Sequence, residues 1–192
     1  MDWSEFYASQ AGRDARPTLL RATKLRNAPP GHAIDLGCGE GSDTRFLLRG
    51  GWQVLAIDGS EGVEQRVRFG VDASFLPALT VQRSDFGDLN ALPVADLVYA
   101  GFSLPFCRPD AFPILWSAIG SSVSSSGFFA GELFGPHDSW ADRKDMNFHS
   151  RHAVDELFAG FEVLDLVEED EDGLSIIGPK HWHVFHIVAR KC

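Results

Sequence analysis

The sequence lacks any apolar run close to the roughly 20 residues that a membrane-spanning helix needs, although 44% of its 192 residues are hydrophobic. Its opening residues, Met1-Asp2-Trp3-Ser4-Glu5, also lack the basic and apolar regions of a secretory signal peptide. A mean hydropathy of −0.08 is typical of an ordinary globular chain. We therefore expect a cytoplasmic protein with no membrane partner.

Cysteine is scarce as well. The sequence holds three, Cys38, Cys107 and Cys192, and they show neither an even count nor paired spacing. This pattern favours reduced thiols over a disulfide framework or a cysteine-rich metal site.

Positive charge is in deficit, with 17 Lys and Arg against 27 Asp and Glu and a formal net charge of −10. Such a surface repels phosphate backbones and anionic membranes, so we expect no nucleic-acid partner. The one basic cluster, which runs from Arg13 to Arg26, is interpreted as the solvated face of a helix.

The most informative stretch that is present runs from Ala33 to Gly41. A short apolar strand carries an acid, Asp35, and is followed by glycines at alternate positions 37, 39 and 41. Glycine permits a sharp turn and lets a ligand approach the backbone. A buried strand, such a loop and then a helix is how α/β folds hold nucleotide-like cofactors. A second strand, about twenty residues on, ends in Asp58, where a carboxylate can accept both hydroxyls of a ribose.

Strands and helices alternate along most of the chain. Residues 1–30 are expected to form a helical extension or lid, and residues 31–192 a Rossmann-like core, together one domain. Strands are expected at about residues 32–37, 54–58, 79–83, 95–100 and 128–134. Helices are expected at about 42–49, 60–71 and 109–122 and after Ser150, with a Ser- and Gly-rich turn at 121–127.

The C-terminal part has a different pattern. Two strand-like runs, 161–167 and 182–189, are separated by an acidic linker at 168–173 and have no helix between them, which suggests an antiparallel pair. The predicted fold is an α/β three-layer sandwich. Its sheet is doubly wound, seven-stranded and mostly parallel, with an antiparallel C-terminal strand.

The segment Asp35-Leu36-Gly37-Cys38-Gly39-Glu40-Gly41 resembles motif I of class I S-adenosylmethionine-dependent methyltransferases. Ile57-Asp58-Gly59-Ser60 is similar to the second motif of that family, and Asp85-Phe86 to the third. Asp96-Leu97-Val98 and Ser126-Gly127-Phe128-Phe129 resemble its fourth strand and the turn into its fifth. Among small-molecule members, the opening Asp2-Trp3 and the C-terminal strand are similar to tellurite-resistance-type methyltransferases.

The resemblance implies S-adenosylmethionine as the cofactor and assigns roles by position. The loop Gly37-Cys38-Gly39 and Asp35 would hold the methionyl part, and Asp58 would accept the ribose hydroxyls. Asp85 and Phe86 would contact the adenine, and Gly101 would lie near the reacting sulfonium. Gly59 also belongs to the cofactor site, although the family often has a bulky apolar residue there.

Methyl transfer from a sulfonium is an in-line displacement that needs orientation more than a catalytic group. The sequence shows no catalytic triad or dyad, so the catalytic residue is left unassigned. The acceptor is expected beyond the ends of the fourth and fifth strands. The candidate acceptor residues are Tyr7, Phe102, Ser103, Phe106, Phe134, His137 and His149. The two histidines could take a proton from the acceptor.

Two further classes stay open. An oxidoreductase with a nicotinamide cofactor would need a third fingerprint glycine, where this chain has Ser42. A noncatalytic S-adenosylmethionine-binding domain would need no signature residue. His181 and His183 share one face of the last strand, but with no Cys or acidic partner at ligand spacing they predict no metal. The expected partner is a small-molecule acceptor, and the expected assembly is a monomer or homodimer.

Overall fold

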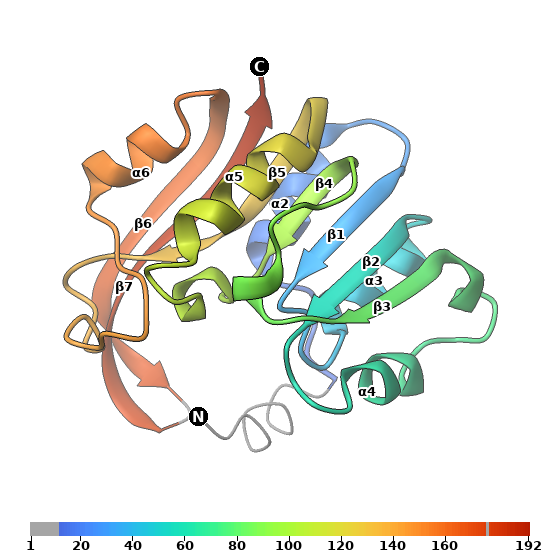
Figure 1. Ribbon diagram of the computed structural model, residues 1–192, viewed down its shortest axis with the longest axis horizontal. Coiled ribbons are helices and arrows are strands. Elements are labelled where there is room, and N and C mark those ends of the chain that lie inside the picture. Colours follow the sequence, from blue (N-terminus) through green and yellow to red (C-terminus); the bar gives the residue numbers. More distant parts are fainter. Residues whose placement is uncertain (1–11, 176) are drawn as a thin grey trace.

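The fold is organised around a seven-stranded sheet with the strand order β3-β2-β1-β4-β5-β7-β6 (Figure 1). The computed structural model describes residues 12–175 and 177–192. The strands are β1 (His32–Leu36), β2 (Gln53–Asp58), β3 (Leu79–Arg83), β4 (Ala95–Ala100), β5 (Val123–Phe134), β6 (Phe161–Ser175) and β7 (Gly178–Lys191). Strands β1 to β5 pair in parallel, and β7 is antiparallel to both of its neighbours. The predicted mostly parallel sheet is confirmed.

Helices cover both faces of this sheet, which gives three layers (Figure 1). One face is covered by the three helices that carry Leu19, Leu47 and Val67, and these side chains pack against the sheet. On the other, Leu115 and Val154 of the last two helices do so. The helices are α2 (Pro17–Arg26), α3 (Ser42–Arg49), α4 (Val63–Phe69), α5 (Phe112–Ser122) and α6 (Arg151–Leu157). Within the described ranges, no helix has the length and apolar character to cross a bilayer.

Three short 3-10 turns lie between these elements. They are η1 (Leu76–Ala78), η2 (Phe86–Asp88) and η3 (Leu104–Phe106). The last two follow β3 and β4 directly at the edge where the parallel strands end. The chain order turns back at β1, because β2 pairs on one side of it and β4 on the other. In open α/β sheets this switch point is where ligands bind.

Several of the expected boundaries are wrong. The helix expected from residue 60 begins at Val63, because Gly62 adopts a left-handed conformation and the hydroxyl of Ser60 binds Asp58 instead of capping the helix. The expected turn at 121–127 is divided between the end of α5 and the start of β5, which pairs with β4 with a shift of register.

Another wrong boundary is the acidic linker at 168–173. These residues belong to β6, which pairs with β7 without interruption from Asp165 to Ser175. The acids on one face of β6 meet histidines, and the cross-strand hydrogen bonds and ion pairs between them stabilise strand pairing in an otherwise self-repelling run.

Candidate active site

A cavity of about 600 Å³ lies at the carboxyl ends of β1, β2, β3 and β4. This volume is within the range typical of small-molecule sites, roughly 300–1,000 Å³. Eight of the nine residues predicted to bind a cofactor line it: Gly37, Cys38, Gly39, Asp58, Gly59, Asp85, Phe86 and Gly101. Segments that are far apart in the sequence therefore meet around one space.

Asp58, the last residue of β2, links the two loops on either side of it. Its Oδ2 accepts the N–H of Gly39 at 2.9 Å, and its Oδ1 accepts the N–H of Ser60 at 2.8 Å. The residue is only 7% exposed, yet it lines the cavity. A carboxylate that is buried in this way is stabilised by its backbone donors and holds the glycine loop next to the end of β2.

Asp35 is the predicted cofactor residue that does not line the cavity. It is 1% exposed beneath the glycine loop, and the hydroxyl of Thr44 donates to its Oδ2 at 2.6 Å. Burial, followed by the charge of Asp43, raises the pKa of Asp35 to about 7. Asp43 accepts from the guanidinium of Arg13, with one N–O distance of 3.1 Å, and from the N–H of Arg16 at 3.0 Å. Two buried acids thus lie near one paired arginine.

Two glycines allow close backbone contacts in this site. Gly37 has φ +74°, and a Cβ there would lie 2.2 Å from the Cβ of Ser103, whose hydroxyl donates to the carbonyl of Leu36 at 2.5 Å. At Gly59 a Cβ would lie 2.3 Å from Oδ1 of Asp85. The carboxylate of Asp85 therefore occupies the space that a bulky side chain at position 59 would need, which explains why this position is a glycine.

Phe102, Ser103 and Phe106 form the side of the cavity that follows β4. Phe102 has φ +55°, which is unusual for a residue with a side chain. Its N–H donates to Oε2 of Glu132 at 3.0 Å, and the guanidinium of Arg16 lies 4.6 Å from its ring centre. Glu132, which is 1% exposed in β5, was not among the predicted site residues. It is the single acid in the apolar run of residues 128–134, and a buried acid in such a run indicates a functional or structural role.

Three further acceptor candidates, Phe134, His137 and His149, do not line the cavity. Phe134 packs behind Phe102 and Phe106, with ring centres 6.2 and 6.3 Å away. His137 is exposed and pairs with Asp170 outside the cavity. His149 packs on Phe112 with ring centres 4.7 Å apart.

Burial lowers the pKa of His149 to about 4, so this imidazole is neutral at physiological pH. Tyr7 lies outside the described residues.

Charged residues that were not predicted for the site complete the lining, among them Arg13, Glu40, Asp88 and Arg108. The interpretation of Arg13 as part of a solvated helix face is wrong, because it precedes α2 and pairs with buried Asp43. Cys38 and Cys107 also face the cavity, but burial raises the pKa of both thiols, that of Cys107 to about 11. Neither is a thiolate nucleophile at neutral pH. The site is suited to binding and orienting a ligand.

Comparisons with known proteins agree with this geometry. Residues 34–129, half of the chain, match the family described as a methyltransferase domain. Trans-aconitate 2-methyltransferase of Acidovorax sp. (strain JS42) is 28% identical over 106 residues, which are 54% of this chain and 39% of that protein. The chain thus matches about two fifths of the length of this relative.

Two solved structures share the fold. TehB from Haemophilus influenzae superimposes with a TM-score of 0.76 at 14% identity, over 98% of this chain and 66% of its own. The 1,6-didemethyltoxoflavin-N1-methyltransferase of Burkholderia thailandensis has a TM-score of 0.71 at 19% identity, over 99% of this chain and 82% of its own. Its structure contains bound S-adenosylhomocysteine.

Proposed function

This chain belongs to the methyltransferase domain family, and we propose that it transfers a methyl group from S-adenosylmethionine to a small-molecule acceptor. We also propose that it acts as one domain, with residues 1–30 as an extension over a core of residues 31–192. We further propose that it acts in the cytoplasm as a monomer or homodimer. The net charge of −10 supports the absence of a nucleic-acid partner.

The observation that carries the proposal is the carboxylate of Asp58 at the switch point of the sheet. It is buried, faces a cavity of about 600 Å³ and lies next to a loop whose glycine N–H it accepts. A carboxylate in this position can accept both hydroxyls of a ribose. The residues present therefore fit an adenosyl cofactor.

The other predicted cofactor residues would contact different parts of the cofactor. Asp85 and Phe86 would hold the adenine, and the backbone of Gly37 and Gly39 would lie along the methionyl part. Cys38 and Gly59 would line the cofactor with backbone atoms, and Gly101 would leave room beside the sulfur. Asp35 supports the loop from below through Thr44.

When bound, S-adenosylmethionine supplies a methyl group that is already activated on a sulfonium. The chain has to align the acceptor with it and exclude water, which contributes roughly 7–11 kcal/mol in favourable cases. Phe102, Ser103 and Phe106 would do this from the acceptor side. The neutral thiols of Cys38 and Cys107 are consistent with direct transfer that forms no bond to the protein.

The charged rim supports an anionic acceptor. Arg16 and Arg108 lie in the lining on the side where Phe102 and Phe106 are found. Small carboxylic acids are therefore the first acceptors to test, and trans-aconitate leads the panel because a relative is named for it. Phenols, thiols and amines complete the panel.

Binding calorimetry with S-adenosylmethionine, S-adenosylhomocysteine and NAD tests the cofactor. We expect Asp58→Ala to weaken S-adenosylmethionine binding by about 1.5–3 kcal/mol, since hydrogen bonds to a charged group are lost. This corresponds to roughly 10–150-fold in the dissociation constant. Asp155→Ala, which removes an exposed acid on α6, serves as the matched control and should bind as the wild type does. Equal affinities in the two variants, or a preference for NAD, would contradict the proposal.

Methyl transfer is then measured with cofactor labelled in the methyl group. Transfer to one class of the panel supports the enzyme. Tight cofactor binding without transfer to any compound or to a cell extract would indicate a noncatalytic binding domain instead.

A further inference from the structure

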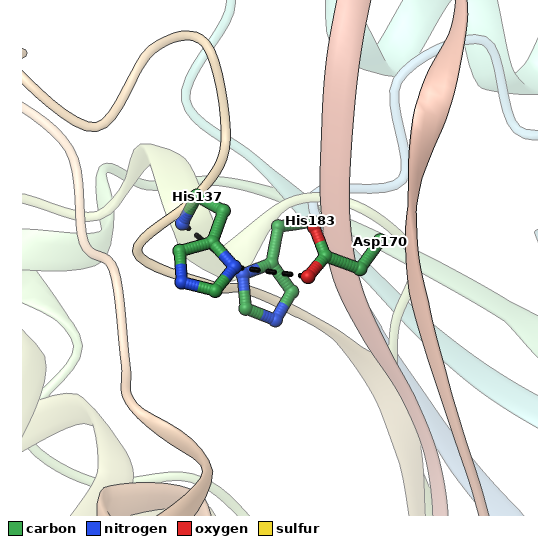
Figure 2. Close-up of side chains that lie close together, drawn as sticks. All are labelled: His137, Asp170 and His183. Atoms are coloured by element: carbon green, nitrogen blue, oxygen red, sulfur yellow. Dashed lines mark hydrogen bonds and ion pairs between the residues drawn. The ribbon is translucent and has the colours of Figure 1, made fainter.

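Three elements bring His137, Asp170 and His183 together on the outer part of the sheet (Figure 2). His137 belongs to the loop after β5, Asp170 to β6 and His183 to β7. Each offers one ligand atom, and these atoms all lie within 4.8 Å of one another. Nδ1 of His137 is 2.9 Å from Oδ2 of Asp170, and the two imidazole rings are stacked with centres 4.7 Å apart.

Strand register creates this cluster. Asp170 lies directly opposite His183 in the antiparallel pair of β6 and β7, so the two side chains share a face. The loop that carries His137 is joined to β7 by two backbone hydrogen bonds. Gly135 donates to the carbonyl of His183 at 2.7 Å, and Ser139 donates to that of His181 at 3.1 Å. The cluster is therefore fixed by backbone pairing on two sides.

Neighbouring groups orient the three side chains. Nδ1 of His183 accepts the N–H of His137 at 3.1 Å, and its Nε2 is 3.1 Å from Glu168. The second oxygen of Asp170 is 2.8 Å from Nε2 of His181. In metalloproteins, hydrogen bonds of this kind, which an imidazole N–H donates to an outer carboxylate, orient the metal ligands.

The surroundings of the cluster are also acidic. Glu168 and Asp172 lie on the same face of β6, two residues to either side. The protein as a whole carries a net charge of −10.

We propose that His137, Asp170 and His183 bind a divalent transition-metal ion of the Zn²⁺ type. The ion replaces the hydrogen bond between His137 and Asp170 and one of the two hydrogen bonds that the ring of His183 makes, with the N–H of His137 or with Glu168, and water completes its coordination. Two imidazoles and one carboxylate are a donor set that zinc and its neighbours accept, whereas magnesium and calcium prefer oxygen donors alone. The sequence predicted no metal because no acid stands at ligand spacing within the last strand, and the acid comes from the strand beside it.

The bound ion would connect the loop of residues 135–150 to the β6–β7 ribbon. That loop contributes Met146 and Phe148 to the cluster around Phe134, which packs behind the cavity residues Phe102 and Phe106. The ion thus has a structural role, and its binding does not depend on the proposed methyl transfer.

The test is a Zn²⁺ titration of the chelator-treated protein against a chromophoric chelator at about pH 7.5, where free imidazoles are neutral. We expect one equivalent to bind with a dissociation constant of about 1 μM or lower. Co²⁺ in place of Zn²⁺ should give visible absorption bands of a nitrogen and oxygen site, and Zn²⁺ should raise the melting temperature.

His137→Ala and Asp170→Asn change exposed side chains, so both variants are expected to fold. Each should weaken Zn²⁺ binding by at least about tenfold and remove the gain in melting temperature. The matched control is His152→Ala, an exposed histidine on α6 that pairs with Glu156, and it should bind as the wild type does. The absence of a saturable equivalent, or equal affinity in all three variants, would overturn the proposal and leave a hydrogen-bonded network.

Discussion

Charged side chains gather in two parts of this molecule, and the two clusters balance their charges differently. The loop cluster lies beneath the cavity and consists of Arg13, Asp35, Asp43, Thr44 and Tyr99. The ribbon cluster lies along β6, β7 and the loop after β5 and consists of His137, Asp138, Asp170, Lys180 and His183. In the first, two buried acids share one arginine, whereas in the second each acid has a basic partner of its own.

The difference teaches how each site holds charge. In the loop cluster, two buried acids share the positive charge of Arg13. The pKa of Asp35 therefore rises to about 7, and below that pH its carboxyl group holds a proton. In the ribbon cluster, Lys180 and Asp138 form an ion pair whose side chains are 2% and 0% exposed. The loop cluster should therefore respond to pH, and the buried ion pair of the ribbon cluster should respond to the loss of either partner.

The largest effect is expected from Asp138→Ala in the ribbon cluster. The change leaves the ammonium of Lys180 buried among aromatic rings, with the ring centre of Trp182 3.9 Å away. Removing one member of a buried ion pair typically costs about 3–5 kcal/mol. We expect a loss of that size in the free energy of unfolding measured by urea denaturation.

The double variant Asp138→Asn with Lys180→Met is the control. It removes both charges, nearly keeps the volume and leaves an oxygen for the N–H of Trp140, so it should recover most of the loss. A loss below about 1 kcal/mol in Asp138→Ala would show that the pair is more hydrated than its burial indicates.

The next effect is expected from Asp35→Asn in the loop cluster, and unlike that of Asp138→Ala it should depend on pH. Because the carboxyl pKa is raised on folding from 3.8 to about 7, the folded state holds a proton that the unfolded state has lost in this window. The stability of the wild type should decline relative to the variant between about pH 4 and 7, by at most about 1.4 kcal/mol per pH unit. Above about pH 7 the difference should stay constant.

Urea denaturation of both proteins at intervals across this range measures the difference. Asp155→Asn on α6 is the control for loss of an exposed carboxylate. A difference that does not change with pH would mean that Asp35 is ionised throughout and that Arg13 neutralises both acids.

The smallest effect is expected from Tyr99→Phe. The hydroxyl of Tyr99 lies 3.5 Å from Oδ2 of Asp43, at the outer limit of a hydrogen bond, while Arg13 binds the same carboxylate more closely. We expect a change within about 1 kcal/mol in the free energy of unfolding. A loss above about 2 kcal/mol would make Tyr99 a main partner of Asp43 and would weaken the contrast between the clusters.

Much of the cavity could be predicted because its residues stand at strand ends. Asp58 and the loop from Gly37 follow apolar strands directly, and the bounds predicted for α3, 42–49, match the structure. The alternation of apolar strands and glycine-rich turns in the neighbouring sequence is enough to locate residues at strand ends. The reason for a glycine at position 59 could not be predicted, because it depends on the side chain of Asp85, which follows β3 and occupies the neighbouring space.

The ribbon cluster could not be predicted for the same reason. The acids from Glu168 to Asp172 have the composition of an exposed linker, and only their register with β7 places them opposite histidines. His137 was assigned to the acceptor side because it follows β5, but hydrogen bonds of its loop to β7 turn it towards Asp170. Contacts across strands carry no signal in local sequence.

The strand order has a consequence for how the sheet is assembled. β7 is made after β6 but lies between β5 and β6, so β5 keeps an open edge and β6 has no partner strand until residues 178–191 emerge from the ribosome. The parallel half, with its cavity, can pair earlier during synthesis. The outer ribbon has to wait for the last strand to insert, and the chain is most exposed to mispairing during that interval.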